Sequence, residues 1–187
     1  MIAARLSAIV MACLLTSAAH AQSTYRLLAT SKTSTMQKEM QQAGDAGFHF
    51  VAVMGGETAV GGNETVVLME KNSDDTTKYS YRLLATSKTS TLEKELREAA
   101  DDGFNVVGQT LFESMLGGKE SAAIVEKRST DVQIRYEYKL VATSKTSTLQ
   151  KELQELADQG FRAVGMTVGK TAAGGNELVV IARRAAK

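Results

Sequence analysis

One seven-residue string, ATSKTST, occurs three times in this chain, at residues 29–35, 85–91 and 142–148. The segments around the three strings align without a gap over residues 25–71, 81–127 and 138–184. A repeat of this length indicates similar structural units that pack against one another. We therefore expect βαββ repeats at 22–74, 75–130 and 131–187, packed as one domain, after a separate N-terminal segment at 1–21.

Each repeat predicts the element order strand, helix, strand, strand. It begins with an alternating run, YRLLAT, YRLLAT or YKLVAT, which is typical of a strand. The helix that follows has apolar residues at i, i+4 and i+7, such as Met36, Met40 and Ala43 in the first copy. Runs such as FHFVAVM and ETVVLMEK predict two further strands. The expected fold class is α+β, a mainly antiparallel sheet of about nine strands with three helices on one face.

The strands have more apolar surface than one repeat can bury. Residues 66–69 are apolar on both alternating faces, and so are residues 179–181. A single unit of this size forms only a marginal core. The face opposite the helices must therefore contact a curled part of the same sheet, another unit or another chain.

The sequence also predicts where each helix begins and ends. Ser34, Ser90 and Ser147 each stand three residues before Gln37, Glu93 and Gln150, the spacing of a capping box with serine as the N-cap. Gly47, Gly103 and Gly160 stand where a C′ glycine in the left-handed conformation ends a helix. A phenylalanine follows each glycine, and it is expected to fold back on the last helical turn.

The first 21 residues have the order of a cleavable signal peptide. A cationic start is followed by the apolar stretch 6–15 and by the small-residue end Ala19-His20-Ala21. We expect cleavage after Ala21 and a periplasmic or secreted location. Cys13, the only cysteine of the chain, lies in this segment, so the exported chain would have neither a disulfide nor a thiolate metal site.

Charge and composition argue against several classes of partner. The chain has 22 Lys and Arg and 21 Asp and Glu, and Arg5 is the only charged residue of the leader, so the remaining chain is formally neutral. Nucleic acids and anionic membrane surfaces select a basic excess, so we expect neither partner and no membrane insertion after cleavage. His49 is the only histidine outside the leader. We therefore expect no metal site, no cofactor and no catalytic residues.

The pattern EYKLV, LQKELQELADQGF, AVGM and LVVIARR in the third copy resembles a family of short bacterial βαββ domains of unknown function. The resemblance covers most of the chain after the leader. All three copies have phenylalanine where that family usually has tryptophan, and the small glycine inside its helix is present only as Gly44. The resemblance implies the βαββ fold and gives no information about an activity.

The repeated string suggests a small-anion site. A helix N-terminus presents free amides and partial positive charge, and a lysine beside it adds a full charge. The candidate ligand-binding residues share this position in the three copies: Lys32, Thr33, Ser34, Lys88, Thr89, Ser90, Lys145, Thr146 and Ser147. The alternative is that the serine caps the helix and the rest of the loop is solvated.

The most divergent part of the repeats suggests a protein interface. The second copy alone has Leu111, Phe112, Met115 and Leu116 around its second strand and turn. Our leading hypothesis is a non-catalytic binding or assembly module that contacts a protein partner or a second copy of itself. The alternatives are a small-anion binding protein that uses the three SKTST loops and, third, a hydrolase.

Overall fold

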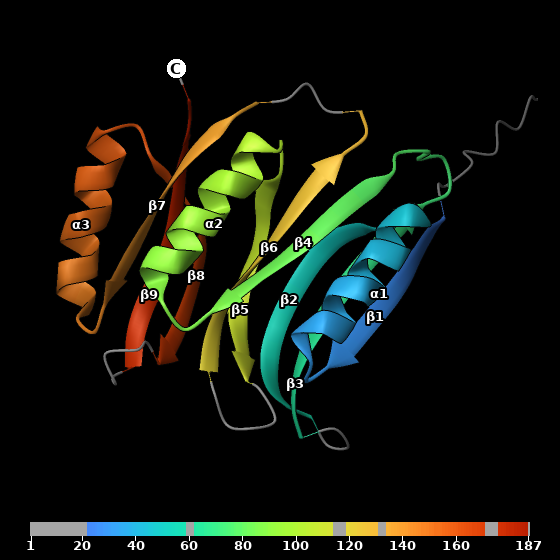
Figure 1. Ribbon diagram of the computed structural model, residues 1–187, viewed down its shortest axis with the longest axis horizontal. Helices are drawn as coiled ribbons and strands as arrows, with labels where there is room; N and C mark the ends of the chain where they lie inside the picture. The colour runs from blue at the N-terminus through green and yellow to red at the C-terminus, as the bar shows by residue number, and fades with distance from the viewer. Residues whose placement is uncertain (1–21, 59–61, 114–118, 131–133, 171–175, 187) are drawn as a thin grey trace, which may run out of the picture.

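A computed structural model describes residues 22–58, 62–113, 119–130, 134–170 and 176–186 (Figure 1). The expected leader at 1–21 lies outside these residues. The three units have the same elements in the same order. Unit 1 has β1 (Ser23–Thr30), α1 (Thr33–Asp45), β2 (His49–Thr58) and β3 (Gly62–Asn72); unit 2 has β4 (Tyr79–Thr86), α2 (Thr89–Asp101), β5 (Asn105–Glu113) and β6 (Lys119–Arg128); unit 3 has β7 (Tyr136–Thr143), α3 (Thr146–Asp158), β8 (Arg162–Lys170) and β9 (Asn176–Ala185).

The α+β class with repeated βαββ units is confirmed. All described strand pairs are antiparallel, and the nine strands form three sheets of three, ordered β1-β3-β2, β4-β6-β5 and β7-β9-β8. The third strand of each unit lies in the middle because it pairs with both of the others. The first strand of each unit is consequently an edge strand, with one row of backbone groups that no strand of its sheet bonds.

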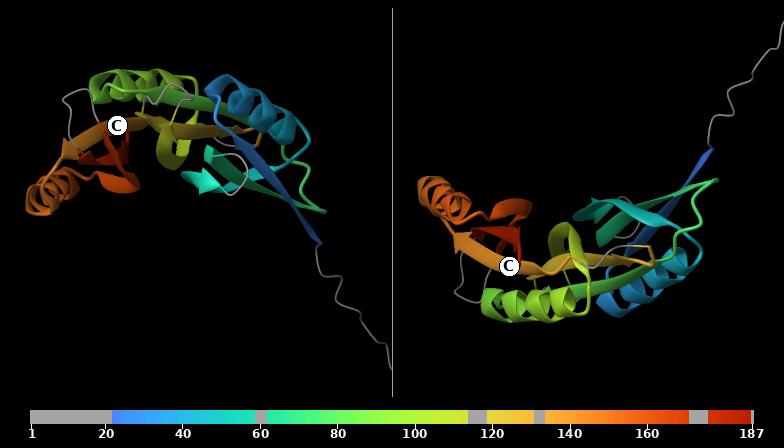
Figure 2. Two further views of the ribbon diagram at one scale, coloured as in Figure 1. Left: turned by 90° about the horizontal axis from the view of Figure 1, so that it is seen from below. Right: turned by 90° about the horizontal axis from the view of Figure 1, so that it is seen from above.

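The units follow one another along a curved row, with the helices on its outer side (Figure 2). Each helix covers more than its own sheet. Helix α1 packs against β1 and more extensively against β4, the first strand of unit 2, and α2 in the same way packs against β4 and more extensively against β7. Each helix therefore bridges its own unit and the next one.

The hydrophobic core lies largely between units. One cluster combines Met36 and Met40 of α1 with Tyr81, Ile124 and Phe112 of unit 2. A second cluster combines α2 and its sheet with Tyr138 and Ile181 of unit 3. The sheet of unit 2 is thus buried on both faces, as the apolar residues on both sides of its strands require.

The helices end as predicted but do not begin as predicted. Gly47, Gly103 and Gly160 have φ of 89°, 85° and 83°, and the amide of Phe48 donates to the Ala43 carbonyl over 2.9 Å. Helix α1 begins at Thr33 with Lys32 as N-cap and no side-chain cap, so the capping boxes expected at Ser34, Ser90 and Ser147 are wrong. The Thr30 hydroxyl instead accepts the Lys32 amide, and this bond shapes the turn one residue earlier.

No helix within the described part of the chain is long and apolar enough to cross a membrane.

Candidate functional site

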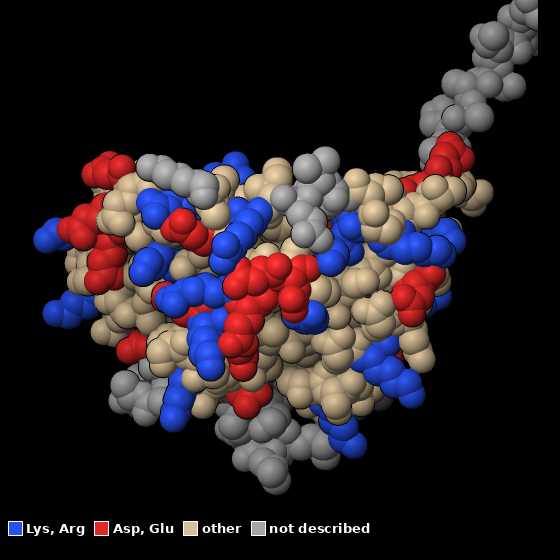
Figure 3. All heavy atoms as spheres, turned by 45° about the horizontal axis from the view of Figure 1, so that its top comes forward, with Lys and Arg blue, Asp and Glu red and all other residues tan. Residues whose placement is uncertain are grey.

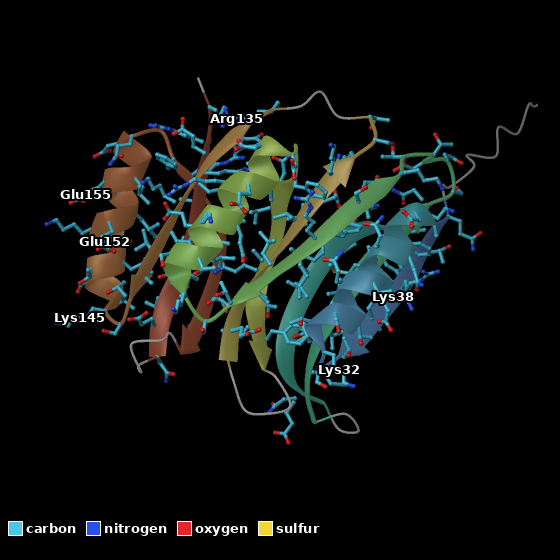
Figure 4. The ribbon with its side chains drawn as sticks, in the orientation of Figure 1. Lys32, Lys38, Arg135, Lys145, Glu152 and Glu155 are labelled. Atoms are coloured by element: carbon cyan, nitrogen blue, oxygen red, sulfur yellow. The ribbon has the colours of Figure 1, made fainter. Side chains whose placement is uncertain are left out.

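The three SKTST loops lie apart along one edge of the row. Each helix starts at this edge, and Figure 4 places Lys32 and Lys145 near its opposite ends. Lys32, Lys88 and Lys145 are all exposed. Part of the repeated string is explained locally, because the hydroxyls of Thr86 and Thr143 accept the amides of Lys88 and Lys145 just as that of Thr30 accepts the Lys32 amide. The structure does not bring the candidate anion-binding residues together.

The divergent hairpin of unit 2 is part of the core. Phe112 is only 1% exposed and lies in the cluster shared by units 1 and 2, and Leu111 is half-buried. Phe112 is therefore unavailable to an external partner, because unit 1 already covers it. Met115 and Leu116, the other two residues of this expected interface, lie outside the described residues.

Two of the described pockets lie beside helices α2 and α3, and a third lies among strands of units 2 and 3. A pocket of about 430 Å³ lies where the end of α2 meets the start of β7, and an ion pair of 2.6 Å between Arg135 and Asp101 lines it. The described residues include no group of three or more His, Cys, Asp or Glu that could hold a metal ion. On the face shown in Figure 3, acidic side chains gather near the middle and are bordered by basic ones.

The most specific polar geometry lies where α1 meets the edge strand β4; we call this the first inter-unit interface. The Gln37 side chain donates through Nε2 to the Tyr81 carbonyl over 2.8 Å and accepts the Leu83 amide through Oε1 over 2.6 Å. Gln41 Oε1 accepts the Tyr81 amide over 3.0 Å. Two glutamines of a helix thus satisfy the edge of a strand that has no further neighbour in its own sheet.

A buried tyrosine forms further hydrogen bonds across the same interface. The Tyr81 hydroxyl donates to Glu126 Oε2 over 2.6 Å and lies 3.3 Å from the Phe48 carbonyl oxygen of unit 1. Glu126 Oε2 also accepts the Phe50 amide of unit 1 over 3.3 Å. Burial, with the neighbouring Glu126 carboxylate, raises the pKa of the Tyr81 phenol above its ordinary range.

The second strands of the units also meet closely. A Cβ on Gly108 of β5 would lie 2.5 Å from the Phe50 ring and 3.1 Å from Val53 of β2. The next pair of units repeats this contact, because a Cβ on Gly165 of β8 would lie 2.6 Å from Gln109 of β5. Glycine lets one sheet approach the side chains of the sheet before it.

The contact of α2 with β7, the second inter-unit interface, uses the same positions with charged residues. Glu93 replaces Gln37, and its Oε2 accepts the Leu140 amide over 3.2 Å. Glu93 Oε1 lies 3.9 Å from Lys139 and forms an ion pair with Arg97, the counterpart of Gln41. The Tyr138 hydroxyl accepts the Val106 amide over 3.0 Å. The two interfaces share a geometry and differ in charge.

The two ends of the row present these same surfaces uncovered. Tyr25 of β1 is 60% exposed, whereas its counterparts Tyr81 and Tyr138 are each 2% exposed. At the other end, Leu153 and Leu156 of α3 are half-exposed, whereas Leu96 of α2 is fully buried.

We define the N-terminal face by Tyr25, Leu27, Val51, Met54 and Glu70. We define the C-terminal face by Gln150, Leu153, Gln154, Leu156, Met166 and Val168. Each member of these faces occupies a repeat position that, in the middle unit, contacts a neighbouring unit or lies next to that contact.

Sequence reasoning missed the glutamines that join the units. Gln37 and Gln41 lie outside the apolar stripe of α1, and the sequence pattern assigns Gln37 to a capping box and gives Gln41 no role. The signal that could have identified them is the recurrence of Gln at 37 and 150 and at 41 and 154, together with their replacement by the complementary Glu93 and Arg97 in the middle copy.

Comparison of the chain with protein-family models, with curated proteins and with solved structures finds no match.

Proposed function

We propose that this chain is an exported, non-catalytic assembly module that binds protein surfaces through its two end faces. The observation that carries the proposal is the distribution of exposed apolar side chains. Seven large hydrophobic residues are exposed in the described part of the chain, and six of them lie on the end faces: Tyr25, Leu27, Val51, Met54, Met166 and Val168. The middle unit contributes none among its described residues.

This exposure of apolar side chains is costly in a chain that otherwise buries its apolar residues well. Burial of one Leu or Met side chain is worth about 1.5–3 kcal/mol. Scattered single hydrophobes on a surface are ordinary, but a contiguous group is typical of an interaction site. On the N-terminal face, Tyr25 and Leu27 lie on β1 and Val51 and Met54 lie on β2, the two outer strands of one sheet. Leu68 of the middle strand β3 pairs with Leu27 on one side and with Ala52 on the other, so it connects the two groups.

The edge of β1 adds a polar reason for a protein partner. The counterpart strand β4 has its Tyr81 and Leu83 backbone groups bonded by glutamine side chains of another unit. Among the described residues, no side chain of the chain makes the equivalent bonds to Tyr25 or Leu27. A partner that supplies such groups gains both apolar burial and backbone hydrogen bonds.

Photo-crosslinking in intact producing cells tests this function. The photoreactive residue p-benzoylphenylalanine replaces Leu27 in one variant and Met166 in a second, and a matched control carries it at Lys94, whose side chain is 76% exposed on the outer side of α2. We expect protein adducts from positions 27 and 166 and none from position 94. Absence of adducts at both end faces, or equal adducts at all three positions, would contradict the proposal.

A further inference from the structure

We propose that the partner is a second copy of this chain, joined head to tail, with the C-terminal face of one copy on the N-terminal face of the next. This inference rests on the proposed function and names the occupant of its two surfaces. In this contact α3 of one copy covers β1 of the next, as α1 covers β4 within the chain. Both free surfaces match the first of the two internal interfaces.

The helix side matches the first inter-unit interface. The two positions of α1 that bond the edge of β4 are Gln37 and Gln41, and α3 has Gln150 and Gln154 at the same positions. Helix α2 has Glu93 and Arg97 there. Gln150 and Gln154 are both exposed. The free helix therefore carries the neutral pair of amides that binds β4, and it lacks the charged pair of α2, in which Glu93 binds β7 and Arg97 pairs with Glu93.

The strand side matches the same interface. Strand β1 reads YRLLAT over residues 25–30, identical to residues 81–86 of β4, whereas β7 reads YKLVAT. The lysine of β7, Lys139, faces the carboxylate of Glu93 at the second interface. Strand β1 has Arg26 at this position, as β4 has Arg82. Its sequence is therefore that of the strand which, within the chain, is bonded by two glutamines.

The central strand supplies a third match. Glu126 lies opposite Tyr81 in the register of β4 with β6, and it accepts both the Tyr81 hydroxyl and the Phe50 amide. In unit 1 the residue opposite Tyr25 is Glu70, again a glutamate, whereas unit 3 has Arg183 opposite Tyr138. Tyr25 and Glu70 thus have the residue types and the register of the Tyr81–Glu126 pair, with Glu70 Oε2 lying 3.7 Å from His49 Nε2 in this chain. The Phe50 counterpart on the other copy is Ala163.

The second strands are complementary as well. Within the chain, the side chains of Val53 and Gln109 each lie over the small residue of the following unit, Gly108 and Gly165. The corresponding side chain of unit 3 is Met166, which is 65% exposed, and the corresponding small residue of unit 1 is Ala52, which is also exposed. Head-to-tail contact places Met166 over Ala52 and Val168 beside Met54.

Besides Ala163, Met166 and Ala52, the new contact differs from the first interface at two positions where the helix meets the edge strand. A Cβ on Gly44 would meet the Tyr79 backbone, whereas α3 has Ala157 and β1 has Ser23 at the equivalent sites. Helix α2 also has alanine there, Ala100, and it still packs against β7. The contact therefore combines the glutamine bonds of the first interface with the helix spacing of the second.

A contact between two different faces continues from copy to copy. Such heterologous assembly gives a closed ring when the rotation between copies closes and an open filament when it does not. Because the units of one chain follow a curved row (Figure 2), each copy added head to tail would continue a curved assembly. Pairing about a two-fold axis would place α3 on α3 or β1 on β1, and neither arrangement reproduces an interface found inside the chain.

Cysteine crosslinking of mixed chains tests the arrangement. In a Cys13→Ala background no other cysteine remains. One tagged chain carries Gln150→Cys and a differently tagged chain carries Leu27→Cys, and a short bismaleimide links thiols in contact. We expect linked species containing both tags in the mixture and none from either chain alone. Links within one kind of chain, or no link in the mixture, would overturn the head-to-tail arrangement.

Light scattering of the unmodified chain against concentration measures the assembly itself. We expect a mass that rises with concentration toward rings or filaments, and Leu27→Asp should hold the mass at that of one chain. Leu27 is 68% exposed, so this change should leave the melting temperature of dilute protein within about 2 °C of wild type, since exposed substitutions have small effects. Lys94→Asp on α2 is the matched control and should assemble normally. A chain that stays monomeric at millimolar concentration would overturn the inference.

The two proposals fail in distinguishable ways. If positions 27 and 166 crosslink in cells only to a different protein while the purified chain stays monomeric, self-assembly is wrong and the module function stands. If neither position gives an adduct in cells and no mixed link forms, both are wrong. Adducts whose masses are multiples of the chain support both.

Discussion

Replacement of Gln37 by alanine should destabilise the chain far more than replacement of Gln150, although both are glutamines at the same helix position. The Gln37 amide is the partner of two β4 backbone groups, the Tyr81 carbonyl at 2.8 Å and the Leu83 amide at 2.6 Å. Tyr81 is buried and Leu83 is half-buried, so water replaces the lost partners only in part. Gln150 is exposed, and no described residue of the chain bonds its side chain.

The expected magnitude follows from these contacts. A buried backbone group left without a partner costs about 1–3 kcal/mol. With partial access of water to Leu83, we expect Gln37→Ala to lower the free energy of unfolding by about 2 kcal/mol in total. An exposed substitution such as Gln150→Ala should stay within about 0.5 kcal/mol. For a chain of this size, about 2 kcal/mol corresponds to a fall of about 4–8 °C in melting temperature.

Urea unfolding of dilute, monomeric protein provides the measurement, followed by circular dichroism and by tyrosine fluorescence. The chain has five tyrosines and no tryptophan, and Tyr79, Tyr81 and Tyr138 are buried. Fluorescence therefore reports on the inter-unit interfaces. Equal losses for Gln37→Ala and Gln150→Ala would refute the reasoning that a helix side chain of one unit satisfies the edge strand of the next.

Two further predictions concern the first inter-unit interface. Burial and the nearby Glu126 hold the pKa of Tyr81 above its ordinary range, and burial with a bond to Asp75 raises the pKa of Tyr79 to about 12. In the unfolded chain these phenols lose their protons near pH 10, whereas in the folded chain they keep them. The free energy of unfolding should therefore fall as the pH rises above about 10. Urea titrations at pH 7 and pH 11 measure this, and Tyr81→Phe should reduce the fall; an unchanged pH dependence in that variant would show that Tyr81 is not its source. Gly44→Ala should destabilise the chain by more than about 1 kcal/mol, although alanine favours helix, because the added Cβ overlaps the Tyr79 carbonyl oxygen and presses on the Tyr81 ring. Ala100→Gly in α2 is the control, which should cost only the helix propensity of about 1 kcal/mol, and a stabilised Gly44→Ala chain would contradict the close approach.

The features predicted correctly from the sequence are those that local physics determines. The apolar stripe at Met36 and Met40 faces the core because helical spacing puts these residues on one side. Gly47 takes a positive φ because the residue that ends a helix in this way must be left-handed. These predictions need only residues within a few turns of each other.

The features that sequence reasoning missed depend on contacts between distant residues. Gln37 was assigned to a local capping box, but its partners Tyr81 and Leu83 lie in the next repeat. Phe112 was expected at an exposed interface, but unit 1 covers it. Alignment of the repeats gives the elements of each unit and leaves open whether nine strands form one sheet or three. The arrangement of the units determines the partners of Gln37, the burial of Phe112 and the number of sheets.

The bridging position of α1 also sets the order in which the chain can fold as it is made. The first core cluster needs Met36 and Met40 of α1 together with Tyr81 of β4 and Ile124 of β6. A nascent chain that ends before residue 124 lacks part of this cluster, so the first unit cannot complete its core when its own residues have emerged. The core of the first unit forms only after most of the second unit has been synthesised, and the core of the second unit forms only after Tyr138 and Ile181 have been synthesised. Each newly made repeat therefore completes the core of the repeat before it, so the units become stable in pairs rather than one at a time.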